Sequence, residues 1–277
     1  MKNRFGISYG LLMGAVGLFF TQFVACGAEM YQVSMESDYD SDRSSEAAYV
    51  PNSPSFGIHS PNGWTKLPIN FRVGAHLSED QINELRKSVR VWEIAVGKSL
   101  FIFEGKHQGI DGDSFKDLYS SLKDSINGNY LDENWGKTGK PEAVLATTIW
   151  TNEDSAAKKI ATADIRFNLQ NYILGDSYKL RNIGRRTVVD MQSVGLHELG
   201  HLLGLTHVDA EHDRLSIMNP TLYIGEGLTS RRISKGDIER IQKIYGCEGE
   251  ACNIDATFDS LSREADLSET GTTLKVN

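Results

Sequence analysis

The sequence predicts an α+β fold built around one main hydrophobic core. Apolar residues recur at every second position in some segments and at helical spacing in others, as expected for strands and helices. Of the 277 residues 40% are hydrophobic and 24% are charged, which excludes a wholly disordered or fibrous protein. The net charge is −8 at pH 7 and no patch rich in Lys and Arg stands out, so nucleic acid is not an expected partner.

The first 25 residues have the layout of an export signal. Lys2 and Arg4 precede an apolar run that ends at Ala25. A permanent membrane helix is the alternative, but the run over 11–25 is shorter than the roughly 20 apolar residues needed to span a bilayer. We therefore expect residues 1–25 to be removed and the mature protein to be exported.

The end of this segment, Phe23-Val24-Ala25-Cys26, resembles the lipobox of bacterial lipoproteins, in which the cysteine becomes the acylated first residue. Phe23 stands where Leu is usual, so ordinary cleavage, for instance after Ala28, stays open. The resemblance implies a lipid anchor in a membrane, and Gly27 implies the outer membrane of the cell envelope. Residues 26–58 are acidic and Ser-rich with few large aliphatic residues, which predicts a solvated tether.

The folded part, residues 59–246, opens with a strand and a helix. Apolar residues alternate from Leu67 to Val73, which predicts a half-buried strand. Ser78 and Gln81 form the pattern of a capping box at the start of a helix. Its apolar stripe makes Trp92 a core residue and comprises Ile82, Leu85, Val89, Trp92 and Val96.

The middle of the chain predicts three strands and one helix. Strands are expected at Phe101–Phe103, Ala143–Trp150 and Ile160–Phe167, the last two as neighbours across a polar turn. Residues 104–142 are rich in Gly and Asp. One amphipathic helix is expected there, with apolar positions Phe115, Leu118, Leu122 and Ile126.

Two more helices and a polar tail complete the pattern. One helix opens near Asp190, and another begins at Ser234 with Asp237 in the capping-box position and stops at Gly246. Residues 247–277 show no strong periodicity. In an exported protein, Cys247 and Cys252 predict a small disulfide loop, with a free thiol pair as the alternative.

Residues 197–207, His-Glu-Leu-Gly-His-Leu-Leu-Gly-Leu-Thr-His, carry the chemistry. Two histidines four residues apart share one face of a helix, so His197 and His201 can bind the same metal ion. Gly204 can take a left-handed conformation that turns the chain back and brings His207 to the same ion. Three protein ligands leave one position open, which is typical of catalytic zinc.

Glu198 is next to the first ligand and is the candidate general base. Zinc lowers the pKa of its bound water toward about 7, and a carboxylate beside the ion can take the proton and later pass it to the leaving amine. The short His-Glu-x-x-His pattern alone also occurs by chance on helix surfaces. The full spacing with Gly204 and His207 is far rarer.

With these residues the sequence resembles the metzincin zinc peptidases. Ser216-Ile217-Met218-Asn219-Pro220 looks like their Met-turn, with Met218 as an apolar floor beneath the histidines. Within the metzincins it is most similar to the matrixins, over about residues 60–246. The resemblance implies a twisted mixed, mostly parallel sheet with an antiparallel edge strand, an N-terminal long helix, an active-site helix and a closing C-terminal helix.

The departures from the matrixin pattern are specific. Thr147 and Arg166 stand where animal matrix metalloproteinases hold a second, structural zinc with histidines, so one zinc ion is expected. Val208 replaces the Ser common after the third histidine. Tyr223 lies too far past Met218 to match the tyrosine ligand of astacins.

The resemblance implies that an extended peptide pairs with the edge strand at Val144, Leu145 and Ala146, while Pro220 helps to shape the adjacent pocket. An ordinary buried strand is the alternative. Calcium is unsupported, because the acidic loop is better read as solvated. The acidic loop comprises Asp209, Glu211, His212 and Asp213. Three other histidines, His59, His76 and His107, are expected to lie at the surface or in the core.

The sequence therefore predicts an exported, membrane-tethered zinc endopeptidase, acting as a monomer on peptide or protein substrates. The main alternative is a surface-tethered binding or adhesion module with a structural zinc, which an intact Glu198 disfavours because binding needs no base. A zinc hydrolase of non-peptide amides is a third possibility.

Overall fold

The computed structural model describes residues 31–34, 56–107, 126–153, 156 and 158–269. Among these residues, no helix is long and apolar enough to cross a membrane. The helices are α1 (Glu79–Val96), α3 (Met191–Leu202), α4 (Lys235–Tyr245) and α5 (Ile254–Glu269), with short 3-10 turns η2 (Trp135–Thr138) and η3 (Gly249–Cys252). The strands are β1 (Tyr31–Ser34), β2 (Ile69–Gly74), β3 (Phe101–His107), β4 (Asn127–Asp132), β5 (Ala146–Asn152), β6 (Ile160–Asn168), β7 (Tyr172–Gly175), β8 (Thr187–Asp190) and β9 (Thr221–Ile224).

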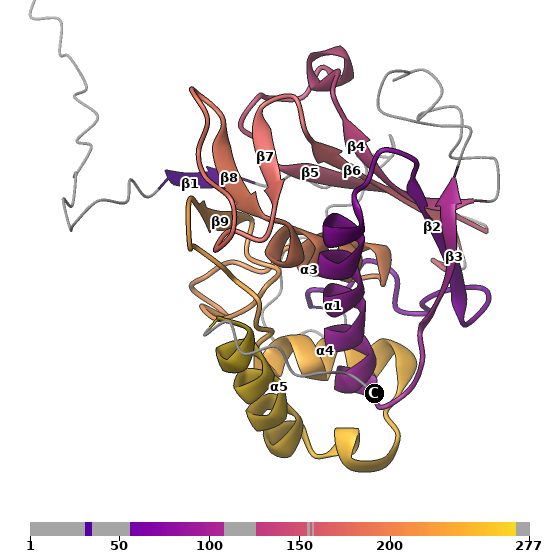
Figure 1. The fold of residues 1–277 in the computed structure, drawn as a ribbon. Helices are drawn as coiled ribbons and strands as arrows, with labels where there is room; N and C mark the ends of the chain where they lie inside the picture. The colour runs from indigo at the N-terminus through magenta and orange to yellow at the C-terminus, as the bar shows by residue number, and fades with distance from the viewer. Residues whose placement is uncertain (1–30, 35–55, 108–125, 154–155, 157, 270–277) are drawn as a thin grey trace, which may run out of the picture.

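Five strands form the main sheet in the order β3-β2-β4-β6-β5 (Figure 1). The pairs β2–β3, β2–β4 and β4–β6 are parallel, whereas β5 runs antiparallel to β6 and forms the edge. The mostly parallel sheet with an antiparallel edge strand is thus confirmed. Two smaller pairs lie beside it, β7 with β8 in parallel and β1 with β9 in antiparallel.

Helix α1 begins at the predicted capping box, in which the Ser78 and Gln81 side chains each bond to the other residue's backbone N–H. It packs on α3 through its apolar stripe. Trp92 is fully buried, as predicted, and its indole N–H donates to the Leu196 backbone oxygen at 2.9 Å. The Ser88 hydroxyl donates to the Gln192 oxygen at 2.8 Å. Because these bonds reach the backbone of α3, they fix one helix against the other.

Some elements differ from the predicted ones. The first strand starts at Ile69, and Leu67 is 40% exposed, because Leu67 precedes Pro68 and lies outside the ladder. Strand β4 was not predicted. The expected helix at Phe115, Leu118 and Leu122 lies outside the described residues, and Ile126 directly precedes β4.

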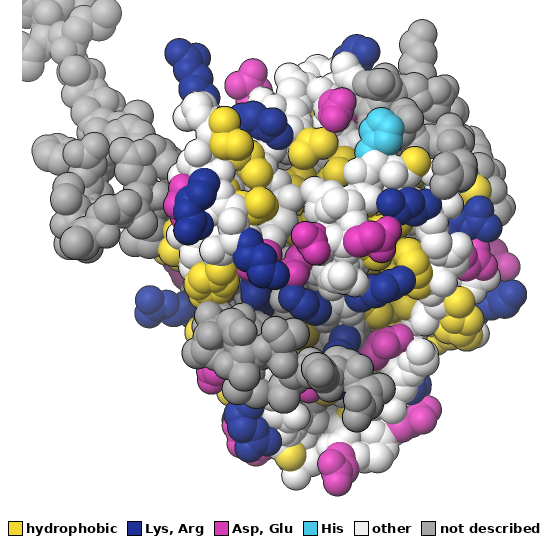
Figure 2. All heavy atoms as spheres, viewed as in Figure 1, with side chains coloured by type: hydrophobic (Ala, Val, Ile, Leu, Met, Phe, Trp, Pro, Cys, Tyr) yellow, Lys and Arg dark blue, Asp and Glu magenta, His cyan; other side chains and the backbone are white. Residues whose placement is uncertain are grey.

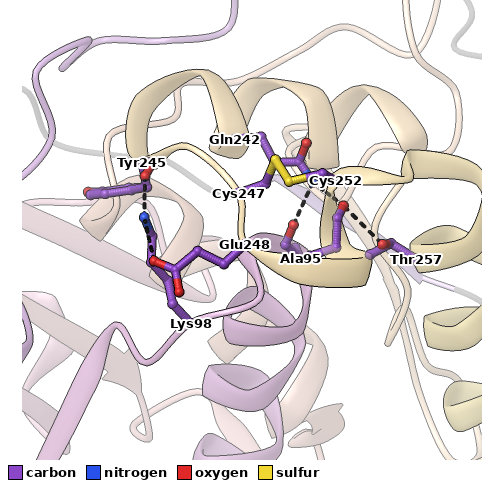
Figure 3. Close-up of a disulfide and its surroundings, with 9 residues drawn as sticks. Ala95, Lys98, Gln242, Tyr245, Cys247, Glu248, Cys252 and Thr257 are labelled. Atoms are coloured by element: carbon purple, nitrogen blue, oxygen red, sulfur yellow. Dashed lines mark hydrogen bonds and ion pairs between the residues drawn. A yellow bond between two sulfur atoms is a disulfide. The ribbon is translucent and has the colours of Figure 1, made fainter.

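The C-terminal region is more regular than its composition indicated. Cys247 and Cys252 form the predicted disulfide (Figure 3). After it comes α5, which no sequence pattern predicted and which packs against α1 and α4 (Figure 1). Gln242 donates to the backbone oxygens of Ala95 and Ala251, both at 2.8 Å (Figure 3). The disulfide loop is therefore tied to both α1 and α4.

A buried ionic network anchors the start of α3. Arg231 is 2% exposed and donates to Asp190 at 2.6 and 3.0 Å and to Asp176 at 3.0 Å. These carboxylates raise the pKa of Arg231 further, although burial opposes them. Elsewhere charges are mixed, and Figure 2 shows acidic and basic side chains interspersed over the face in view.

Candidate metal centre

Helix α3 carries the site and is buried on all sides. Its N-cap, Asp190, accepts from the Ser193 backbone N–H at 3.1 Å, so the helix opens where the sequence predicts. Every residue from Met191 to Leu202 is buried. A helix without a solvent face is held in place along its whole length, which fixes the direction of the side chains that it presents.

The three predicted ligands come together. Their Nε2 atoms are 2.9 Å apart between His197 and His201, 3.2 Å between His201 and His207, and 3.3 Å between His197 and His207. Nitrogen ligands about 2.0–2.1 Å from a tetrahedral zinc ion lie about 3.3 Å from one another, so the triad fits zinc. Within the described part of the chain, this is the group of side chains placed to hold a metal ion.

The opposite ring nitrogens fix which atoms face the metal. His197 Nδ1 lies 2.7 Å from the Ile217 backbone oxygen, and His201 Nδ1 lies 2.9 Å from that of Leu205. A carbonyl only accepts, so each Nδ1 carries the hydrogen and each Nε2 presents a lone pair to the shared point. The donor set is therefore arranged for a cation.

Gly204 makes the turn that brings in His207. Its φ of 108° lies in a region that side chains rarely adopt, and an added Cβ would lie 3.0 Å from the Ser60 oxygen. The Gly204 oxygen also accepts from the backbone N–H groups of His59 and Ser60. Hydrogen bonds from His59 and Ser60 therefore hold the turn that follows α3.

The predicted Met-turn lies against α3, the helix that carries His197 and His201. Met218 is fully buried, and a Cβ on Gly200 would come 2.4 Å from its sulfur, so only glycine permits this approach. Asp237 of α4 accepts from the Ile217 N–H at 2.9 Å and from the Ser216 hydroxyl at 2.6 Å. The closing helix therefore fixes the turn whose carbonyl orients His197.

The pKa values of the ligands suit metal binding. Burial lowers the pKa of His197 to about 3 and that of His207 to about 4, and the pKa of His201 lies well below its ordinary value. All three imidazoles are therefore neutral near pH 7, the form in which they bind a metal.

Glu198 is fully buried beside the triad. The Thr148 hydroxyl lies 2.5 Å from Glu198 Oε2 and 3.1 Å from the Glu198 backbone oxygen. Burial raises the pKa of Glu198 to about 8, against the opposing effects of Thr148 and of the charge on Lys140. No role could be assigned to the Thr148 side chain from the sequence, because Thr148 and Glu198 lie 50 residues apart in the chain.

His59 is a second residue near the site that its sequence context did not single out. Its ring stacks on Trp150 with centroids 4.1 Å apart, and its Nε2 lies 2.9 Å from the His201 backbone oxygen. It supports the end of α3 and is not a ligand. The sequence does not indicate this position, because His59 has no second histidine at the spacing of a metal site.

The predicted substrate-binding residues lie at the start of the edge strand. Val144 and Leu145 directly precede β5, Ala146 begins it, and all three side chains are fully buried. The Leu145 oxygen accepts from the Asn168 N–H at 2.8 Å. Pro220 directly precedes β9. The role of these residues in binding a peptide stays a prediction.

Other residues singled out in the sequence have different surroundings. Arg166 forms a buried ion pair with Asp132 and lies over the Trp135 ring. Asp213 accepts from the Ser234 hydroxyl and from Arg240, so this carboxylate of the acidic loop has protein partners. Cys26 lies outside the described residues.

Comparison with known proteins shows what this part of the chain is similar to. Residues 123–246 match the family model described as Matrixin. Metalloendoproteinase 5-MMP of Arabidopsis thaliana is 47% identical over 60 residues, which cover 22% of this chain and 15% of that protein. Matrilysin of Felis catus is 41% identical over 63 residues, which cover 23% of this chain and 22% of that protein. The chain spans less than a quarter of the length of these relatives.

A solved structure, high choriolytic enzyme 1, a hatching enzyme zinc-protease from the medaka fish Oryzias latipes, matches over 68% of this chain and 96% of that chain. Its sequence identity is 13% and its TM-score is 0.32, too low to add to the comparison. Over residues 123–246 the chain is therefore similar to matrixins, and its mostly parallel sheet and histidine triad are compatible with a zinc metallopeptidase.

Proposed function

We propose that this protein is a zinc-dependent endopeptidase that hydrolyses peptide bonds in peptide or protein substrates. The observation that carries the proposal is the convergence of three histidine Nε2 atoms with the buried carboxylate of Glu198 beside them. The Matrixin match and the metalloendoproteinase relatives support the same reaction class. A binding module with a structural zinc would not need a buried carboxylate at this place.

His197, His201 and His207 would hold the zinc ion, which when bound polarises a carbonyl and acidifies water. Glu198 takes a proton from the attacking water and delivers it to the nitrogen of the departing amine. Burial raises the pKa of Glu198 above its ordinary value, which makes the ionised carboxylate a stronger base toward the water. The residues at the start of the edge strand, Val144, Leu145 and Ala146, would pair with the extended backbone of the substrate.

The test is cleavage of an unfolded protein by the full-length chain purified in detergent. We expect Glu198→Ala to keep the zinc and the fold but to lose at least about 100-fold in kcat, and His201→Ala to lose zinc as well. A chelated sample is the control for metal dependence. Full activity in the Glu198 variant, or in the chelated sample, would contradict the proposal.

We also propose that the protein is an exported monomer, anchored in a membrane of the cell envelope through a lipid on Cys26. The support is the signal-like segment 1–25 and the lipobox resemblance. Labelling of cells with a radioactive fatty acid tests it. The label should be incorporated by the native chain and not by Cys26→Ala, and equal labelling of the two would overturn it.

A further inference from the structure

The hydroxyl of Thr148 is the closest polar partner that the structure gives to the Glu198 carboxylate. Thr148 lies on β5 and is fully buried, and its Oγ1 is 2.5 Å from Oε2 of Glu198. A hydroxyl at this distance from a carboxylate oxygen makes a short charge-assisted hydrogen bond. The bond connects the edge strand of the sheet directly to α3.

The two oxygens of Glu198 have different surroundings. Oε2 is bound by Thr148, whereas Oε1 is buried and has no hydrogen-bond partner among the described residues. A buried carboxylate oxygen without a partner costs free energy unless another molecule supplies a donor. One oxygen is therefore held by the protein and the other is left for water.

We propose that Thr148 is a positioning residue for Glu198: its hydroxyl holds Oε2, so that Oε1 is the oxygen that faces the reacting water. The proposal rests on the proposed peptidase function. Because the torsions of a carboxylate side chain are soft, one fixed oxygen restricts both the position of Glu198 and the rotation of its carboxylate. Thr148 does not touch the substrate in this role.

The Thr148 hydroxyl also lies within reach of a second acceptor of Glu198. Its Oγ1 lies 3.1 Å from the Glu198 backbone oxygen, so two acceptors of one residue share a hydroxyl that has one hydrogen. When Oε2 is charged, the hydroxyl donates to it.

The adjacent residue provides a matched control. Thr147 is equally buried on the same strand, and its hydroxyl has no hydrogen-bond partner among the described residues. Successive side chains of a strand point to opposite faces, so Thr147 points away from Glu198. Thr147→Val and Thr148→Val thus make the same chemical change, and only the second removes the bond to Glu198.

The experiment compares the full-length chain with Thr148→Val, Thr148→Ser and Thr147→Val at matched zinc content. We expect Thr148→Val to lower kcat by about 10- to 100-fold with KM changed less than about 2-fold, because a misplaced base slows the chemical step and leaves binding unchanged. Thr148→Ser should restore kcat to within about 3-fold, since it restores the hydroxyl. Thr147→Val should match the native chain.

A second measurement does not depend on activity. In crystals of the metal-free protein, Glu198 should occupy one conformation in the native chain and in Thr147→Val, and move or split in Thr148→Val. Equal kcat in the two valine variants, with Glu198 unmoved, would overturn the role of Thr148. If the native chain cleaves nothing, the peptidase proposal fails, and the conformation of Glu198 still decides whether Thr148 positions it.

Discussion

The Nδ1 atom of His197 lies 2.7 Å from the backbone oxygen of Ile217, so the turn that contains Met218 orients the first metal ligand. The N–H of the same Ile217 donates to Asp237 at 2.9 Å, and Asp237 also pairs with Arg240 at 2.7 Å. The orientation of a ligand on α3 thus depends on a carboxylate of α4. This dependence leads to the first prediction.

Asp237→Asn should weaken zinc binding by about 10- to 100-fold, because loss of an outer partner loosens the orientation of His197. It should also lower the free energy of unfolding by about 3 kcal/mol, since Asp237 is fully buried and charged. Competition with a zinc chelator and urea unfolding measure the two effects. Glu239→Gln, an exposed change on the same helix, is the control. Equal zinc affinity in both variants would contradict the prediction.

Arg231→Gln should destabilise the protein by about 3 kcal/mol, because it leaves the buried Asp190 without its cation. Arg232→Gln next to it should cost less than about 1 kcal/mol, since Arg232 pairs with Asp266 at the surface. Urea unfolding of the two variants compares a buried ion pair with an exposed one. Similar losses in the two would show that the Arg231 network does not anchor α3.

Replacing Cys247 and Cys252 together by serine should lower the free energy of unfolding by about 2 kcal/mol. The estimate follows from the short loop that the disulfide closes, since a short loop restricts the unfolded chain least. The zinc affinity should stay the same, because the loop, which contains η3, is bound to α4 beside the end of α1 and not to the triad. Thermal unfolding with and without a reductant measures the effect, and an unchanged midpoint in the variant would contradict it.

The contribution of Glu198 to the stability of the metal-free protein should fall as the pH rises from about 4.5 to about 8. Burial raises the pKa of Glu198 from 4.5 to about 8, so between these values this carboxyl binds more protons in the folded state than in the unfolded state. The stability that such a group contributes falls with rising pH. Glu198→Gln cannot ionise and should be more stable than the native chain at pH 8.5, by more than about 1 kcal/mol, with a smaller difference at pH 5.

Urea unfolding in the presence of a chelator measures this difference. Below pH 6.5 the histidines change the stability in the opposite direction. Their lowered pKa values mean that His197 and His207 bind fewer protons in the folded state than in the unfolded state. The comparison between variants at each pH therefore isolates Glu198. A native chain that is as stable as Glu198→Gln at pH 8.5 would contradict the prediction.

The parts of the fold set by neighbours in the sequence were predictable. The capping boxes at Ser78 and Ser234 form as expected, because each needs only residues three positions apart. The histidine triad is predictable for a similar reason, since α-helical geometry places His197 beside His201. These features depend on local geometry that does not change with the rest of the fold.

Features that depend on distant partners were not predictable. Strand β4 contains the buried Asp132, which looks like a surface residue until its pairing with Arg166 is known. Helix α5 buries Thr257, Leu261 and Ala265 at a spacing of four, a stripe too small and polar to stand out. The pairing of β1 with β9 left no local signal, because neither four-residue strand has a distinctive period.

The burial of α3 has a consequence for the exchange of metal. His197 and His201 are fully buried, and His207 is the partly exposed member of the triad. Among the described residues, the route between the ion and solvent therefore passes the ring of His207. Because α3 acquires its surroundings only when the core has packed, the site cannot hold an ion before the chain has folded. A zinc ion is therefore expected to enter the folded protein past the imidazole of His207.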